Sequence, residues 1–128
     1  MNGTRETVSL SLPADPESIA LVRTMVAGVA SKLALAYDAV DDLRIAAAEA
    51  SAMLLTHGAD GSRLRVDLVP SQSDLRLTIW VQGSGAASDL TGPDSLAWRV
   101  IEGLTDEAAV TAVDGDAAVE LRLRTVPA

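Results

Sequence analysis

The sequence predicts an α+β fold, a two-layer sandwich in which amphipathic helices cover one face of a mostly antiparallel β-sheet. Its expected strands alternate apolar and polar residues, whereas parallel strands buried on both faces read as continuous apolar runs. The expected elements follow the order β-α-α-β-β-α-β-β, and the length of 128 residues suits a domain with one core. We therefore expect a single domain over residues 1–128.

The N-terminal half begins with a strand and two helices. Apolar and polar residues alternate over residues 7–12, which predicts a strand with one buried face. Asp15 and Pro16 suit the start of a helix as its cap and first residue, and apolar residues follow at a spacing of three and four. A second helix is predicted from Asp38 to about Gly58. Its buried stripe is Val40, Leu43, Ala47, Ala50 and Leu54.

The C-terminal half reads as two hairpins with a loop and a helix between them. Asp114 and Gly115 lie at the second hairpin turn, where both central residues need positive φ angles. The expected segments are residues 64–68 and 75–81 for the first hairpin, 83–93 for the loop, Asp94 to about Leu104 for the helix, and 109–113 and 119–123 for the second hairpin.

The composition excludes several classes of function. The chain has no cysteine, so it holds neither a disulfide nor a thiolate metal site. Its formal net charge of −8 repels phosphate backbones, which argues against direct binding of nucleic acid. No signal peptide and no apolar stretch of membrane-spanning length is evident, so we expect a cytoplasmic protein without a membrane partner. The acidic balance suits solubility or a partner with a basic face.

The uncovered face of the sheet carries Trp80, which strand parity places outward beside Arg76 and Thr78. Two alternatives stay open for this residue: an exposed anchor for a partner or a second copy, or a Trp half-covered by Arg side chains. The expected outward residues are Thr7, Ser9, Ser11, Arg65, Asp67, Arg76, Thr78, Trp80, Glu120, Arg122 and Arg124.

The second helix carries the most specific motif, Asp41-Asp42-Leu43-Arg44-Ile45-Ala46-Ala47-Ala48-Glu49-Ala50. It resembles the second helix of the GHKL ATPase superfamily, and specifically that of the bacterial anti-sigma factor serine kinases of the RsbW type. The order of strands and helices also resembles that fold, Gly83-Ser84-Gly85 falls at its first glycine box, and residues 95–110 resemble the corresponding helix and strand of divergent actinobacterial members.

The resemblance implies a nucleotide pocket formed by Glu49, Met53, Val81, Gly83 and Gly85. In the family, the glutamate polarises the attacking group, so Glu49 is the remnant of the catalytic base. The family's Mg²⁺-binding asparagine is Met53 here, and a thioether is a poor ligand for a hard cation. The family's adenine-binding aspartate is Val81, which cannot accept a hydrogen bond.

A third departure lies at the expected start of the third helix. The family has a second glycine-rich box at this place. This chain has Asp94 there and no such box, and the carboxylate of Asp94 would repel phosphates. We therefore expect the pocket to be degenerate and ATP and Mg²⁺ to be unnecessary, although the alternative of retained binding stays open.

Other candidate side chains have simpler interpretations. Glu49 can equally be a solvated helix carboxylate paired with Arg44, Lys32 or Arg23. His57, the only histidine, suits the C-terminal end of the second helix. No metal site is expected, because no second histidine and no spaced carboxylate cluster accompanies it. A G-x-S-x-G elbow is also missing, which excludes a hydrolase triad of that type.

Taken with the resemblance, these residues indicate an anti-sigma-factor-like regulatory protein that sequesters a sigma factor and has a degenerate nucleotide pocket. The first alternative is an active ATP-dependent serine kinase that phosphorylates an anti-anti-sigma factor. The second is a structural or signalling dimer domain that binds neither sigma factor nor ATP. A homodimer is expected from the resemblance and from the surface that Trp80 and the strand edges offer.

Overall fold

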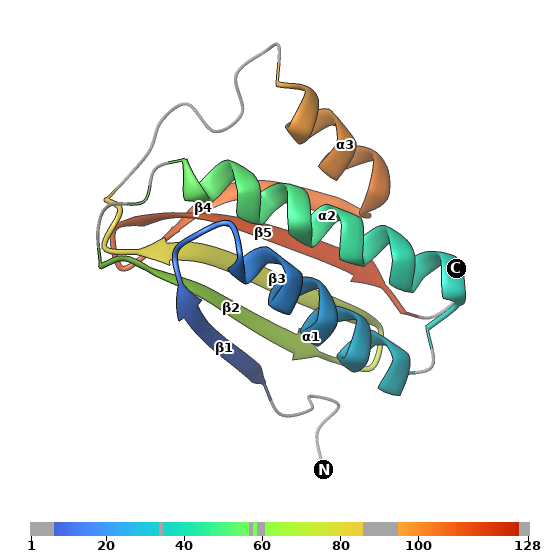
Figure 1. The fold of residues 1–128 in the computed structure, drawn as a ribbon. Coiled ribbons are helices and arrows are strands. Elements are labelled where there is room, and N and C mark those ends of the chain that lie inside the picture. Colours follow the sequence, from blue (N-terminus) through green and yellow to red (C-terminus); the bar gives the residue numbers. More distant parts are fainter. Residues whose placement is uncertain (1–6, 34, 57, 59–60, 86–94, 126–128) are drawn as a thin grey trace.

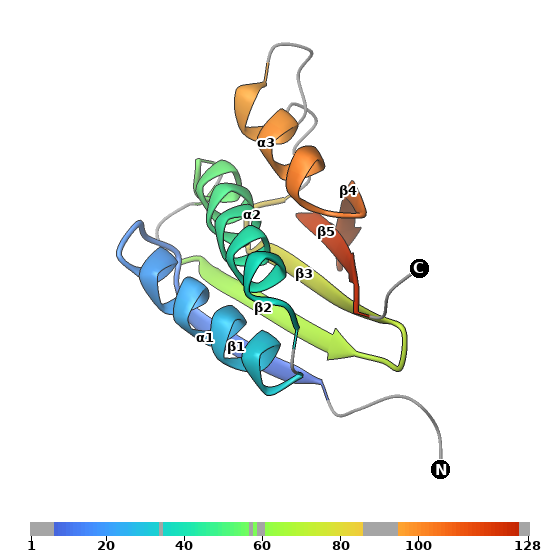
Figure 2. The same ribbon diagram turned by 90° about the vertical axis from the view of Figure 1, so that its right-hand side faces the viewer.

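The computed structural model describes residues 7–33, 35–56, 58, 61–85 and 95–125. One antiparallel sheet of five strands has the order β1-β2-β3-β5-β4, and helices lie on one of its faces (Figure 1; Figure 2). This two-layer arrangement and the order of elements confirm the predicted fold class. The elements are β1 Val8–Pro13, α1 Ser18–Lys32, α2 Tyr37–Leu55, β2 Arg63–Pro70, β3 Asp74–Gln82, α3 Leu96–Leu104, β4 Glu107–Val113 and β5 Asp116–Arg124.

The core lies between the helices and the inner face of the sheet. Leu77 on β3 pairs in register with Leu121 on β5, and both are fully buried. From the helix layer, α1 contributes Val22 and Val26, and α2 contributes Leu43. The apolar stripes of both helices face the inner side of the sheet. The alternating apolar residues of the strands and the apolar stripes of the helices therefore form one interior.

The start of α1 differs from the prediction. The helix begins at Ser18, two residues after Pro16, and the Asp15 carboxylate accepts a hydrogen bond of 3.0 Å from the backbone N–H of Glu17 within the preceding turn. Ser18 donates through its hydroxyl to the carbonyl of Pro13 at 2.7 Å, which ties the helix start to the end of β1. The carboxylate of Asp15 therefore orders the connection before the helix rather than capping the helix itself.

The later elements follow the prediction with shifted ends. The Ser95 hydroxyl caps α3 by accepting a hydrogen bond of 3.1 Å from the backbone N–H of Trp98. The predicted helix start at Asp94 lies outside the described residues. At the second hairpin, Asp114 and Gly115 have φ angles of 50° and 86°, as the predicted tight turn requires.

The outer face of the sheet carries Trp80 as predicted, but its ring is covered. Trp80 is 8% exposed, and the guanidinium of Arg65 lies 5.5 Å from the centre of the ring. Arg65 also donates a hydrogen bond of 3.0 Å to the side-chain carbonyl of Gln82. Of the two alternatives for Trp80, the structure therefore supports the Trp covered by an Arg side chain. Trp80 offers little apolar surface to a partner.

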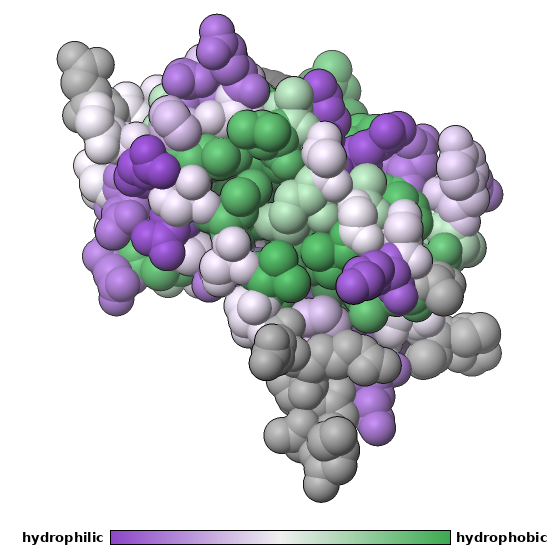
Figure 3. All heavy atoms as spheres, turned by 60° about the horizontal axis from the view of Figure 1, so that its bottom comes forward, coloured by the Kyte–Doolittle hydropathy of each residue, from purple (hydrophilic) through white to green (hydrophobic). Residues whose placement is uncertain are grey.

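Exposed apolar surface lies instead over β1 and α1. Figure 3 shows hydrophobic residues gathered near the middle of the face that carries these two elements. Val8 on β1 is 36% exposed and Leu21 on α1 is 55% exposed, and Leu10, Met25 and Val29 are partly buried. In the described ranges, no helix is long and apolar enough to cross a membrane.

Candidate functional site

Helix α2 places Glu49 and Met53 one turn apart, on neighbouring parts of its surface. Glu49 is half-buried and lines a surface hollow of about 380 Å³ between α1 and α2, together with Arg23 and Arg44. Within the described residues its carboxylate makes neither a hydrogen bond nor an ion pair. The suggested pairing of Glu49 with Arg44 is wrong, because Arg44 pairs with Asp41 on the same helix.

Met53 and Val81 both belong to the apolar interior. Met53 is half-buried and packs against the core, and Val81, near the end of β3, is fully buried. Neither side chain carries an oxygen that could hold a cation or accept a hydrogen bond from a base. Packing in the apolar interior accounts for the presence of Met53 and Val81 at these positions without a ligand.

Gly83 and Gly85 form a turn directly after β3, here named the glycine turn (residues 83–85). Their φ angles are 94° and 74°, a region that residues with a Cβ rarely adopt. The hydroxyl of Ser84 donates to the carbonyl of Val81 at 2.7 Å and closes the turn from inside. The glycines are therefore required by the backbone whether or not a nucleotide binds.

The glycine turn is held by the side chain of a residue that the sequence analysis did not identify. The carboxylate of Asp116, the first residue of β5, accepts hydrogen bonds from the backbone N–H groups of Gly83, at 3.1 Å, and of Gly85, at 2.8 Å. The backbone N–H of Ala117 donates to the carbonyl of Gly85 at 3.2 Å. In the sequence Asp116 simply follows Asp114 and Gly115 of the predicted hairpin turn, and no local signal links it to residues about thirty positions earlier.

This arrangement changes what the glycine turn can bind. Two backbone N–H groups that converge on one point form the kind of site that suits an anion. Here the two oxygens of one internal carboxylate already satisfy both donors. A phosphate would have to displace Asp116 and would meet its negative charge.

The remaining predicted candidates fall outside the site. His57 and Asp94 lie outside the described residues, so their predicted roles stay predictions. In the parts of the chain that the structure describes, no group of three or more His, Cys, Asp or Glu side chains is placed to hold a metal ion. Among the predicted pocket residues, the structure thus brings Val81 and the glycine turn together, and it places Glu49 on the surface of α2.

Comparison with known proteins identifies related chains. The profile of the histidine kinase-like ATPase domain matches residues 12–124. The serine-protein kinases RsbW of Bacillus thuringiensis (strain Al Hakam) and Bacillus cereus (strain AH820) are each 31% identical over 84 residues, which is 66% of this chain and 52% of theirs. The chain therefore spans about half the length of these curated relatives.

Two solved structures are similar in fold. The RsbU and RsbW domains of Rv1364c from Mycobacterium tuberculosis match with a TM-score of 0.72 and 16% identity, over 94% of this chain and 32% of that one. The histidine kinase domain of the blue-light activated histidine kinase EL346 from Erythrobacter litoralis matches with a TM-score of 0.56 and 15% identity, over 88% of this chain and 61% of that one. At these identities the likeness concerns the fold alone.

Proposed function

Because the chain belongs to the histidine kinase-like ATPase domain family, we propose that it is an anti-sigma-type regulatory protein that sequesters a sigma factor through protein contacts. In this proposal its nucleotide pocket is degenerate and its own surface performs the function. The similarity to RsbW serine-protein kinases over 66% of the chain supports the type of regulator. The altered residues of the nucleotide pocket support a role in binding a sigma factor rather than in catalysing phosphate transfer from ATP.

The single observation that carries the proposal is the burial of an aliphatic side chain, Val81, in the core. This side chain is fully buried, and the resemblance assigns its position to the carboxylate that recognises adenine. An aliphatic group there leaves the base amino group without an acceptor, at a cost of about 1–3 kcal/mol. The core packing of Val81 also means that its position serves stability in this chain.

The residues present do not fit Mg-ATP. Met53 offers a thioether where Mg²⁺ prefers oxygen ligands in octahedral geometry. Asp116 holds the backbone N–H groups of the glycine turn that would otherwise be free for an anion. Met53 thus weakens the contact with the metal, Asp116 the contact with the phosphates and Val81 the contact with the base. We propose that neither ATP nor Mg²⁺ is required.

A homodimer is part of the proposal, with β1 and α1 as its interface. The support is the exposed apolar surface over these elements, including Leu21 at 55% exposure, and the free edge of β1 in the sheet order (Figure 3). Leu21→Asp should reduce the dimer fraction measured by light scattering. Leu96→Asp is the matched control, because Leu96 is 73% exposed on α3. A wild-type protein that stays monomeric at high micromolar concentration would overturn this part.

The active serine kinase is the second candidate, in which an anti-anti-sigma factor is the substrate. The name of the Bacillus relatives and the retained Glu49, whose carboxylate is unpaired among the described residues, favour it. Transfer of radiolabelled phosphate from ATP to candidate anti-anti-sigma proteins, lost in Glu49→Gln, would replace our proposal with this one. A dimer domain that binds neither sigma factor nor ATP is the third candidate.

The experiment that tests the proposal mixes the purified protein with the candidate sigma factors of its own cell, with and without Mg-ATP. We expect a complex and repressed transcription under both conditions. The formal charge of −8 predicts that association with a basic sigma surface slows as salt rises, while the complex persists. Binding to none of the sigma factors would favour the dimer domain, and binding that needs Mg-ATP would favour the kinase.

A further inference from the structure

Strand β4 is an unprotected edge of the sheet. Within the part of the chain that the structure describes, it pairs with β5 on one side only, because it ends the strand order β1-β2-β3-β5-β4. Five of its seven residues are exposed, and Val110, which points to the helix side of the sheet, is itself 39% exposed. Its side chains are thus largely uncovered on both faces of the sheet. A strand in this position presents unpaired backbone N–H and C=O groups to a further strand.

The sequence of β4 lacks the features that usually block edge pairing. Between Glu107 and Asp114 the residues are Ala108-Ala109-Val110-Thr111-Ala112-Val113, without charge, proline or glycine. Natural edge strands are normally protected by charged side chains, proline or a bulge. The small Ala side chains leave room for another backbone, and Val and Thr favour the extended conformation of a strand.

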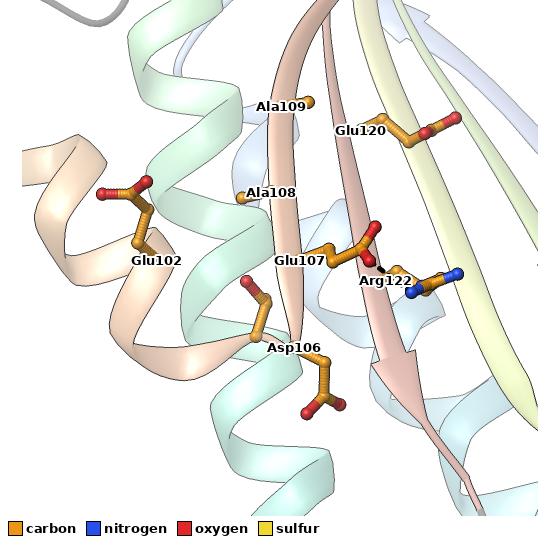
Figure 4. Close-up of a pocket in the computed structure, with 8 residues that line it drawn as sticks. Glu102, Asp106, Glu107, Ala108, Ala109, Glu120 and Arg122 are labelled. Carbon is orange, nitrogen blue, oxygen red and sulfur yellow. Dashed lines mark hydrogen bonds and ion pairs between the residues drawn. The ribbon is translucent and has the colours of Figure 1, made fainter.

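An acidic hollow of about 390 Å³ lies at the beginning of β4. Figure 4 shows Glu102 on the α3 side of the strand and Glu107, Glu120 and Arg122 on the other side. Glu107 is paired with Arg122. In contrast, the carboxylates of Glu102 and Glu120 make no hydrogen bond or ion pair within the described residues. Two unneutralised carboxylates therefore flank the start of the open edge.

We propose that the β4 edge, residues 107–113, binds an extended segment of a partner protein as an added strand, with a Lys or Arg side chain of that segment in the acidic hollow. The backbone of the segment would pair with the outward backbone groups of β4, and its positive charge would be attracted by the carboxylates of Glu102 and Glu120, which lie on the two sides of the edge (Figure 4). At about 3.3 Å per residue, the uncharged run accommodates a segment of about six residues. This inference does not rest on sigma-factor binding.

A second copy of the chain fits this edge poorly. Antiparallel self-pairing centred on Val110 would set Asp106 of each copy opposite Asp114 of the other. Like charges directly opposite each other destabilise a strand pair. A partner segment with a basic residue near its end replaces this repulsion with attraction, which is why the charges favour a different protein.

The probe for this surface is the fluorescent peptide acetyl-Lys-Val-Thr-Val-Thr-Val-amide, with its Lys replaced by Glu as the matched control. We expect the Lys peptide to bind the full chain in fluorescence anisotropy at least tenfold more tightly than the Glu peptide. Hydrogen exchange should show new protection of backbone N–H groups within residues 107–113 only with the Lys peptide.

Two protein variants separate the parts of the proposal. The double variant Glu102→Lys/Glu120→Lys should invert the preference between the two peptides and leave the melting temperature close to that of the wild type. Val110→Lys should weaken both peptides at least tenfold, because it places a charge on the edge. Absence of Lys-peptide binding up to millimolar concentration, or binding unaffected by both variants, would overturn the proposal. Self-association that Val110→Lys abolishes would identify a second copy as the occupant and would equally overturn it.

Discussion

The carboxylate of Asp116 accepts a hydrogen bond of 2.8 Å from the backbone N–H of Gly85, and its second oxygen accepts one of 3.1 Å from Gly83. These contacts join the start of β5 to the turn after β3, so one side chain fixes the part of the chain that the resemblance assigns to a nucleotide. Both bonds involve an ionised acceptor, which makes them stronger than hydrogen bonds between neutral groups.

Asp116→Ala should therefore destabilise the protein by about 1–3 kcal/mol, because it removes both bonds to the glycine turn. Urea unfolding measures the change, and hydrogen exchange should show faster exchange of the N–H groups of Gly83 and Gly85. Glu102→Ala is the matched control, since it removes a carboxylate without a partner among the described residues. Equal stability of the two variants would contradict the assigned role of Asp116.

Val81→Asp should lower the stability of the fold, even if the new carboxylate can accept a hydrogen bond from a nucleotide base. The position is fully buried in the core, so the new carboxylate would lie in an apolar interior without a charged partner. A buried polar group without a partner costs about 2–7 kcal/mol, and the variant should melt at a much lower temperature than the wild type. Val81→Ala separates lost packing from buried charge. If Val81→Asp melts no lower than Val81→Ala, Val81 is not the buried packing residue described here.

The same reasoning predicts weak or absent binding of Mg-ATP by the wild-type protein. A ligand present at 100 times its dissociation constant should stabilise the folded state by about 2.7 kcal/mol, which a thermal melt detects. We expect no such shift with millimolar Mg-ATP, and no binding heat in calorimetry. Met53→Asn is the first substitution to test for recovered affinity, because Met53 is only half-buried and tolerates a polar group better than Val81 does. Micromolar binding by the wild type would contradict the degenerate pocket.

The elements could be predicted from the sequence where periodicity is strong. The alternation in 64–68 and 75–81 predicted β2 and β3, because one face of each strand is buried under the helices. Helix starts were less certain, since Asp15 orders a turn rather than the helix that follows it. Such ends depend on local hydrogen bonds that several nearby polar residues can make equally well.

The site was less predictable, because its contacts join distant parts of the chain. The glycine spacing located the turn at residues 83–85, but no pattern pointed to Asp116 as its partner. Strand parity likewise placed Trp80 on the outer face correctly. Its cover by Arg65 depends on the register of β2 with β3, which sequence alone does not fix.

Leu77→Ala tests the position of the core. Leu77 is fully buried in the centre of the sheet and lies opposite Leu68 and Leu121 on the neighbouring strands. Removal of its side chain should cost about 2–5 kcal/mol, from lost burial and the cavity that remains. Leu96→Ala, at a site that is 73% exposed, should change the free energy of unfolding by less than about 0.5 kcal/mol. A similar loss in the two variants, measured by urea unfolding, would show that the core is misplaced.

Arg65 should protect Trp80 both by covering its ring and by its charge. The guanidinium lies 5.5 Å from the ring centre, and Trp80 is only 8% exposed although the described helices all lie on the other face of the sheet (Figure 2). Arg65→Ala should therefore expose the ring and destabilise the protein by about 1–2 kcal/mol. In a Trp98→Phe background, where Trp80 is the only tryptophan, its fluorescence, excited selectively over that of Tyr37, should shift to longer wavelength.

Arg65→Met distinguishes the two contributions, because it keeps an apolar side chain over the ring and removes the cation. The Nε atom of Arg65 is buried and has no hydrogen-bond partner within the described residues, which offsets part of the cation's benefit. The Met variant should therefore keep the wild-type emission wavelength and lose less than half of the stability that the Ala variant loses. Arg76→Ala, a neighbouring exposed arginine on the same face, should change neither quantity. If Arg65→Met shifts the emission as far as Arg65→Ala does, the charge rather than the cover keeps Trp80 away from water.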